Sequence, residues 1–311
     1  MEQKTERKLV WTNAAVVCLV ALLCCFLWGS AFPGIKIGYG IFDISGEQTG
    51  LQIIFAGTRF FLAGIMAVVI GSFAHKRPLF PKKTSWLPIL HLSLLQTTLQ
   101  YFFFYIGMGK TSGVKASIIE ALNVFVALFV ACLLFKQEKL TGKKIIGSVL
   151  GFLGIVIVNV VGNGFDLSFT LLGEGFILIS TISSAFSSAF IKRFSKTTDV
   201  VMLSGYQFFF GGVVMATIGL IAGGRLNSVA PYSWVLLCYM GFISAAAYTI
   251  WSILLKYNNV SKISAYKFMN PLFGVVLSFI ILQEKSQLGI QTVIALILVC
   301  AGIYVVNREN K

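Results

Sequence analysis

Two apolar stretches of this chain carry the same pattern of polar and small residues. The stretches run from Gly113 to Lys139 and from Ser261 to Lys285, and each exceeds the ~20 residues needed to cross a bilayer. The pattern is Glu120, Asn123, Ala127 and Ala131 in the first stretch and Lys267, Asn270, Gly274 and Ser278 in the second, with matching positions 147 residues apart. Steps of three and four residues place each set on one helix face. Because both stretches also end in Gln-Glu-Lys, we interpret them as an internal duplication.

Apolar runs of this length follow one another along nearly the whole chain. Hydrophobic residues make up 57% of the sequence and charged residues 12%, and a soluble protein would carry about twice that charged fraction. The short alternating strands typical of a transmembrane β-barrel are absent. The sequence therefore predicts an all-α membrane protein. Its ten transmembrane helices are expected at about residues 12–38, 51–73, 86–109, 113–135, 142–161, 171–192, 200–222, 232–256, 262–283 and 287–306.

Lysine and arginine residues gather on one side of these expected spans. With the N-terminus in the cytoplasm, 18 of the 25 lie in cytoplasmic segments, 4 in outer segments and 3 within spans. Cytoplasmic loops are enriched in these residues. We therefore expect a multi-pass protein of the bacterial cytoplasmic membrane with both termini in the cytoplasm. The net charge of +14 then belongs to these loops, and nucleic acid is not an expected partner.

The duplication divides the chain into a first five-helix repeat at residues 1–161 and a second at residues 162–311. Five is an odd number, so the second repeat would enter the membrane in the opposite orientation to the first. Inverted repeats related by a two-fold axis in the membrane plane are typical of secondary transporters. The predicted architecture is therefore ten transmembrane helices arranged as two inverted five-helix repeats.

Several short motifs recur at particular places in the spans. The first span carries Trp28-Gly29-Ser30-Ala31-Phe32, the second carries Arg59-Phe60, and the ninth carries Pro271, thirteen residues before Glu284. With the ten spans and the repetition, these motifs resemble the EamA-type carriers of the drug/metabolite transporter superfamily over nearly the whole chain. The first copy departs from the family pattern, because Phe125 stands where a proline is usual. The resemblance implies transport of a small organic solute, often an amino acid or related metabolite and frequently for export.

A charged side chain inside a membrane span is costly and usually functional, and we select Arg59, Glu120 and Lys267 as the candidates inside the expected spans. Glu120 either forms a structural ion pair with Arg59, which lies at a similar depth, or binds a cationic group or a coupling proton. Lys267 lies near the cytoplasmic end of its span. Its side chain either extends to water or points into the bundle, where it would bind a substrate carboxylate or close a gate.

The uncharged candidates for substrate binding lie on several spans. Asn123 and Asn270 are nearest the middle of the bilayer and are predicted to hydrogen-bond the solute, or alternatively to join neighbouring helices. Other polar and aromatic side chains are expected around the same cavity, although the aromatic ones could instead mark the membrane interface. These further candidates are Trp28, Gln96, Gln100, Tyr101, Ser184 and Tyr248.

No pattern typical of an enzyme or a metal site occurs in the sequence. The six cysteines lie inside apolar runs, and neither histidine has a cysteine or carboxylate at ligand spacing. We therefore expect no cofactor and no metal. The predicted function is secondary transport, as a permease or exporter, of a small polar metabolite such as an amino acid, by alternating access across the lipid bilayer. The alternative is a channel or a non-transporting scaffold, and the oligomeric state stays open, a homodimer included.

Overall fold

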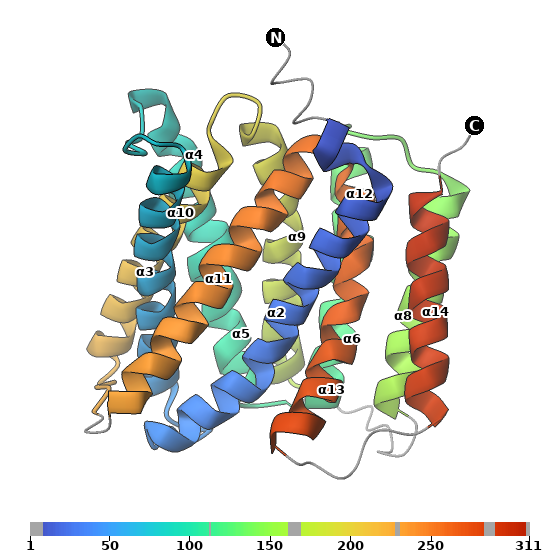
Figure 1. Cartoon of the computed structure of the whole chain (residues 1–311). Coiled ribbons are helices and arrows are strands. Elements are labelled where there is room, and N and C mark those ends of the chain that lie inside the picture. Colours follow the sequence, from blue (N-terminus) through green and yellow to red (C-terminus); the bar gives the residue numbers. More distant parts are fainter. Residues whose placement is uncertain (1–8, 112, 161–168, 228–230, 283–289, 309–311) are drawn as a thin grey trace.

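The computed structural model describes residues 9–111, 113–160, 169–227, 231–282 and 290–308, and all regular structure in these ranges is helical. Figure 1 shows one bundle in which α2 (Ala14–Ile41) begins and α14 (Ile290–Asn307) ends at the same end. We call this the N/C end and the opposite one the distal end. The predicted all-α class is therefore confirmed.

The helices follow the expected spans in order. Up to residue 160 they are α3 (Thr49–Ala74), α4 (Trp86–Leu92), α5 (Gln100–Met108), α6 (Gly113–Ala121), α7 (Asn123–Phe129) and α8 (Gly142–Val160). From residue 171 they are α9 (Phe176–Phe194), α10 (Val200–Ile221), α11 (Pro231–Tyr257), α12 (Val260–Ser264) and α13 (Met269–Leu282). The π-helical turns η2 (Ser93–Leu99), η3 (Val130–Leu134) and η4 (Leu171–Gly175) and the 3-10 turns η1 (Lys83–Ser85) and η5 (Ala265–Phe268) adjoin them.

Eight helical segments of the described chain are long and apolar enough to cross a membrane. They are Ala14–Ile41, Thr49–Ala74, Lys115–Leu134, Leu171–Phe194, Val200–Ile221, Tyr232–Tyr257, Val260–Ile281 and Ile290–Asn307. The expected spans at about 86–109 and 142–161 are also helical, but they are not among the eight. Polar side chains such as Gln96 and Gln100 lower the hydropathy of the former. The expected number of ten spans is thus not confirmed by this criterion.

Helices α3 and α10 pack with their backbones in contact. Glycines recur every seven residues along both helices, at Gly57, Gly64 and Gly71 and at Gly205, Gly212 and Gly219. A Cβ atom added at Gly57 or Gly64 would lie 2.3 Å from a backbone nitrogen of α10, and one added at Gly212 would lie 2.3 Å from the backbone nitrogen of Phe61. Small residues allow such close approach of membrane helices.

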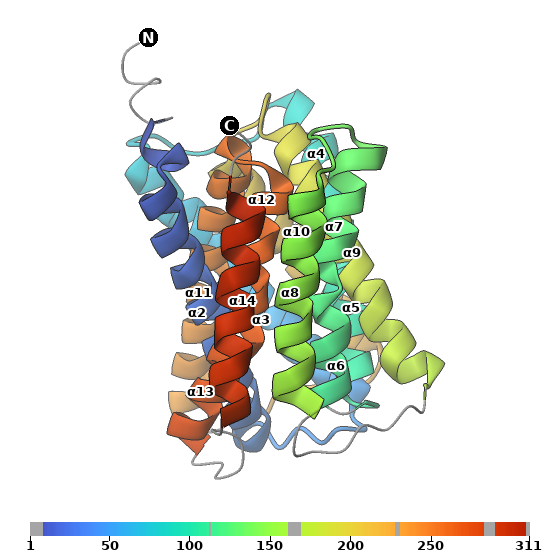
Figure 2. The same cartoon turned by 90° about the vertical axis from the view of Figure 1, so that its right-hand side faces the viewer.

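Helices α8 and α14 form a second close pair. A Cβ atom at Gly147 would lie 2.6 Å from the carbonyl oxygen of Gly302, and one at Gly302 would lie 2.5 Å from the carbonyl oxygen of Gly147. Figure 2 shows these two helices side by side along their length. In Figure 1 the α3–α10 pair lies on the left of the bundle and the α8–α14 pair on the right.

Candidate binding site

Both segments that carry the matched pattern are interrupted shortly before their asparagine. In the first, α6 ends at Ala121 and α7 begins at Asn123. In the second, the 3-10 turn η5 separates α12 from α13, and Asn270 is the second residue of α13. Pro271 has no N–H group and cannot continue the helical hydrogen bonds. The thiol of Cys25 in α2 lies 3.2 Å from the carbonyl oxygen of Tyr266 and donates a hydrogen bond to it across this break.

A cavity of about 130 Å³ lies between these two breaks. It is bounded by α2, α3, α5, α6, α7, α9, α11 and α13 together with the turns η2 and η5. All ten residues that the sequence analysis selected as binding candidates line it: Trp28, Gln96, Gln100, Tyr101, Glu120, Asn123, Ser184, Tyr248, Lys267 and Asn270. The structure therefore brings the candidates together, and their role in binding stays a prediction.

Lys267 points into the bundle. Its Nζ atom donates hydrogen bonds to Asn123 Oδ1 at 2.9 Å and to Ser184 Oγ at 3.2 Å, and it lies 5.9 Å from the centroid of the Trp251 ring. Asn123 in turn donates through Nδ2 to the carbonyl oxygen of Thr181 at 3.0 Å. The alternative in which Lys267 extends to water at the membrane surface is thus wrong, because its ammonium group finds acceptors on α7 and α9.

Arg59 and Glu120 line the same cavity without forming the ion pair that we considered from their depth. Arg59 Nε donates to the carbonyl oxygen of Met240 at 3.2 Å and to Ser244 Oγ at 3.0 Å. Among the described residues, no ion pair joins Arg59 to Glu120. The physical reason is that α11 packs against α3 and supplies neutral acceptors to the guanidinium group. The ion-pair interpretation is therefore wrong.

Aromatic rings form one wall of the cavity. The ring of Trp28 meets those of Tyr248 and Trp251 edge-on, with centroids 4.9 Å apart in each case. The hydroxyl groups of Tyr101 and Tyr248 share a hydrogen bond. Trp251 is 1% exposed and Tyr248 is 7% exposed. These side chains belong to the interior, so a membrane-interface role for Trp28 and Tyr248 is excluded.

Some polar atoms around the cavity form hydrogen bonds within the protein, and others have no such partner. The π-helical turn η2 brings Gln96 to α10, where its Oε1 atom accepts a hydrogen bond from Gln207 Nε2 at 2.6 Å. Five buried polar atoms of cavity residues have no hydrogen-bond partner within the described part of the chain. They are Trp28 Nε1, Gln100 Oε1, Thr181 Oγ1, Trp251 Nε1 and Asn270 Oδ1. These donors and acceptors are available to a bound molecule.

Sequence reasoning missed Thr181 as a cavity residue. Thr181 interrupts a series of serines on α9, and its carbonyl oxygen, rather than its side chain, orients Asn123. Trp251 also lines the cavity, and it shares the helix face of Tyr248 because it follows that residue by three positions.

A larger cavity of about 580 Å³ adjoins this one on the distal side. Its wall includes Lys36 near the end of α2, Met108 at the end of α5, and Ser278 in α13. Glu120 and Pro271 line both cavities and so mark their junction. The two cavities therefore adjoin, and the larger one extends from the central cavity toward the distal end. Gly274 and Ser278 continue the polar face of α13 along this path.

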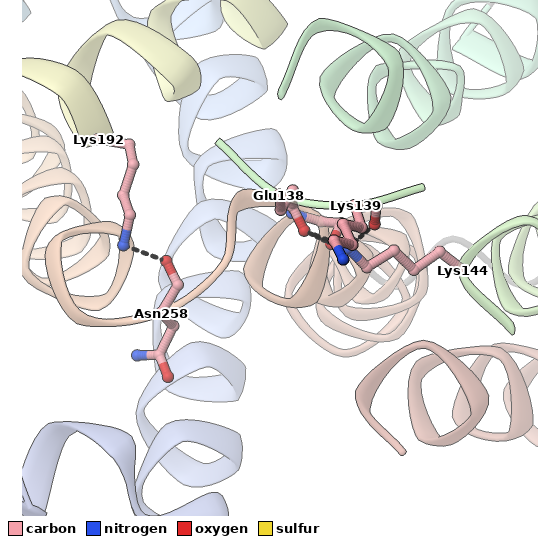
Figure 3. Close-up of polar contacts among 6 residues, drawn as sticks. Glu138, Lys139, Lys144, Lys192 and Asn258 are labelled. Atoms are coloured by element: carbon pink, nitrogen blue, oxygen red, sulfur yellow. Dashed lines mark hydrogen bonds and ion pairs between the residues drawn. The ribbon is translucent and has the colours of Figure 1, made fainter. Parts of the chain in front are cut away.

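Packing closes the bundle between the central cavity and the N/C end. Leu254 and Ile263, one turn or more nearer that end, are fully buried, and Phe268 is 1% exposed. Polar contacts lie beyond this apolar layer, and Figure 3 shows two of them. Lys192 Nζ donates to the carbonyl oxygen of Asn258 at 2.7 Å.

Glu138 makes the second of these polar contacts at the N/C end. Its Oε1 atom accepts from the backbone N–H of Ser261 at 2.9 Å, and its Oε2 atom accepts from the Ser261 hydroxyl group and from Lys144 Nζ, the latter at 2.5 Å. Figure 3 shows the bond between Glu138 and Lys144. The carboxylate thus joins the segment after η3 to the start of α12. The matching tripeptide at residues 283–285 lies outside the described residues.

Comparison with known proteins finds sequence similarity over nearly the whole chain. The family model described as "EamA-like transporter family" matches residues 15–160 and again residues 171–308. An uncharacterized transporter of Bacillus subtilis, YvbV, is 27% identical over 94% of this chain and 92% of its own length. A WAT1-related chloroplastic protein of Arabidopsis thaliana is 26% identical over 91% of this chain and 67% of its own.

A solved crystal structure also has this fold. It superposes with a TM-score of 0.74 at 15% sequence identity, covering 94% of this chain and 97% of the other. At this identity the likeness concerns the fold alone.

Proposed function

Because the chain belongs to the EamA-like transporter family, we propose that it is a secondary transporter of a small polar organic metabolite, with amino acids as one candidate class. The observation that carries this proposal is the central cavity. It is lined by polar and aromatic side chains from ten helical elements, adjoins a larger cavity on the distal side and is closed toward the N/C end. A cavity that extends toward one side of the bundle and is closed toward the other is what a carrier requires, whereas a channel needs a continuous polar path.

We further propose that ten transmembrane helices form two inverted repeats. The glycines that join α3 to α10 support this, because Gly57, Gly64 and Gly71 each lie 148 residues before Gly205, Gly212 and Gly219. The breaks before Asn123 and Asn270 occur at matching places. A two-fold axis would also explain why α3 packs on α10 and α8 on α14, since each pair would consist of equivalent helices.

In this proposal the structure is one of two access states. The excess of lysine and arginine in segments at the N/C end favours the cytoplasm on that side, so the cavity would be open to the outside. Exchange of the packing between the two repeats would open the N/C end and close the distal end. Direction of net transport would follow from the gradients that drive it.

Purified protein in proteoliposomes tests the proposal. A thermal-shift screen of amino acids and other polar metabolites would first identify stabilising solutes, because a ligand that binds the folded state raises its stability. We expect a stabilising solute to show saturable uptake and counterflow. Flux that does not saturate would contradict a carrier and favour a channel, and a complete lack of flux for every stabilising solute would favour a scaffold.

Replacing Asn270 with leucine will greatly weaken binding of such a solute while the protein stays folded. The Asn270 Oδ1 atom has no hydrogen-bond partner in the described ranges and lies at the cavity, so the change removes an acceptor without breaking an internal bond. The loss of a buried hydrogen bond to solute should weaken affinity roughly tenfold or more. Isothermal titration gives the affinity, and an unchanged value would remove Asn270 from the site.

Replacing Glu120 with glutamine will remove the pH dependence of transport. Glu120 lies at the junction of the two cavities, and no ion pair holds it among the described residues, so a proton from the distal side could bind there. Glutamine keeps the shape of the side chain but cannot exchange a proton. Uptake measured across a pH series checks this, and a pH profile identical to that of the wild type would show that Glu120 carries no coupling proton.

A further inference from the structure

The wall of the central cavity has more positive than negative groups. Its charged residues are Arg59, Lys267 and Glu120. Within the described ranges, no carboxylate forms an ion pair with either cation, and their hydrogen bonds go to carbonyl, hydroxyl and amide oxygens. With both cations protonated, the wall carries an excess of one positive charge when Glu120 is ionised and of two when it is neutral. Desolvated charge is costly unless it is balanced.

Unused hydrogen-bond donors lie near this excess charge. An ammonium group has three N–H donors, and the two hydrogen bonds of Lys267, to Asn123 and Ser184, use two of them. The indole N–H groups of Trp28 and Trp251 are buried and have no partner within the described chain. A carboxylate accepts several hydrogen bonds at once and forms its strongest ones with charged donors. The available groups therefore match an organic anion better than a cation.

The size and the apolar wall of the cavity further limit which organic anions can bind. A volume of about 130 Å³ is close to the ~150 Å³ cavity that holds a benzene molecule in another protein. We infer that the central cavity binds a small organic monocarboxylate, its carboxylate against Lys267 and its planar or apolar body against Trp28 and Trp251. A single negative charge equals the excess that remains when Glu120 is ionised. This inference rests on the proposed function and specifies its substrate class.

Three compounds of nearly equal shape test the inference: benzoate, benzamide and benzylamine. Isothermal titration of the purified protein should give a dissociation constant for benzoate that is lower than for the other two by about tenfold or more, the usual effect of a charge-assisted hydrogen bond. The Lys267→Gln variant should lose this preference, and Lys267→Arg should keep it. Lys82→Gln, which changes an exposed lysine outside the helices, should behave like the wild type.

Several results would overturn the inference. They are equal or tighter binding of benzamide or benzylamine, a benzoate preference that survives in Lys267→Gln, and no benzoate binding at millimolar concentration. The comparison of the three compounds on the wild type needs no variant, so it decides the matter even if Lys267→Gln fails to fold. Counterflow of labelled solutes in proteoliposomes separates the two proposals. Benzoate binding at Lys267 without any counterflow would contradict transport alone, whereas saturable counterflow of benzylamine but not of benzoate would contradict the anion site alone.

Discussion

Replacing Glu138 with alanine will lower the melting temperature of the protein by roughly 10 °C. The side chain of Glu138 is 3% exposed and that of Lys144 is 9% exposed. Without the carboxylate, the Lys144 ammonium would stay buried without a counter-charge, and the first turn of α12 would lose the acceptor for the Ser261 N–H group. Removal of one partner from a buried ion pair costs about 3–5 kcal/mol. Thermal unfolding monitored by tryptophan fluorescence would measure the change.

Two further variants separate the ion pair from a general effect of mutation. Lys139→Ala alters the exposed neighbour of Glu138 and should leave the melting temperature almost unchanged, as surface substitutions usually do. The double variant Glu138→Ala/Lys144→Met should melt higher than Glu138→Ala, because no unpaired charge is then left buried. A single variant as stable as the wild type, or a double variant that is less stable than the single one, would contradict this account.

The helix bounds could largely be predicted because they depend on local sequence. The expected spans 51–73 and 200–222 correspond closely to α3 (Thr49–Ala74) and α10 (Val200–Ile221). The position of the helix interruption in the expected span 262–283 could not be predicted from local sequence. Pro271 indicates that a helical bond is lost, but the 3-10 turn lies before it and is stabilised by Cys25 from another helix.

The candidate site likewise combines features that depend on local sequence with features that depend on contacts between residues far apart in the chain. Helical periodicity correctly predicts that Glu120 and Asn123 face one cavity, since they lie three residues apart in one expected span. Helical periodicity could not predict the hydrogen-bond partner of Arg59. Ser244 is 185 residues away in the chain and becomes a neighbour only through the packing of α3 on α11. Likewise, the hydrogen bonds of Lys267 to α7 and α9 decide its direction, and neither follows from its depth in a span.

Replacing Gly212 with alanine will destabilise the protein by about 3 kcal/mol, near the upper end of the usual cost of overpacking. The added methyl group would lie 2.3 Å from the backbone nitrogen of Phe61. A backbone cannot rotate out of the way as a side chain can, so α3 and α10 would have to move apart along the heptad series of glycines that joins them. The separation would also disturb Arg59, which α3 places at the cavity.

Gly40→Ala provides the matched control for this prediction. Gly40 lies in the last turn of α2, and a Cβ atom there would meet no atom within 4 Å. Replacement of an unstrained helical glycine by alanine usually stabilises a protein by about 0.4–1 kcal/mol, because it reduces the freedom of the unfolded chain. The two variants add the same methyl group, so their melting temperatures should change in opposite directions. If Gly212→Ala instead melts at or above the wild-type temperature, direct backbone contact does not hold α3 and α10 together, and the glycine spacing would no longer support a two-fold relation between these helices.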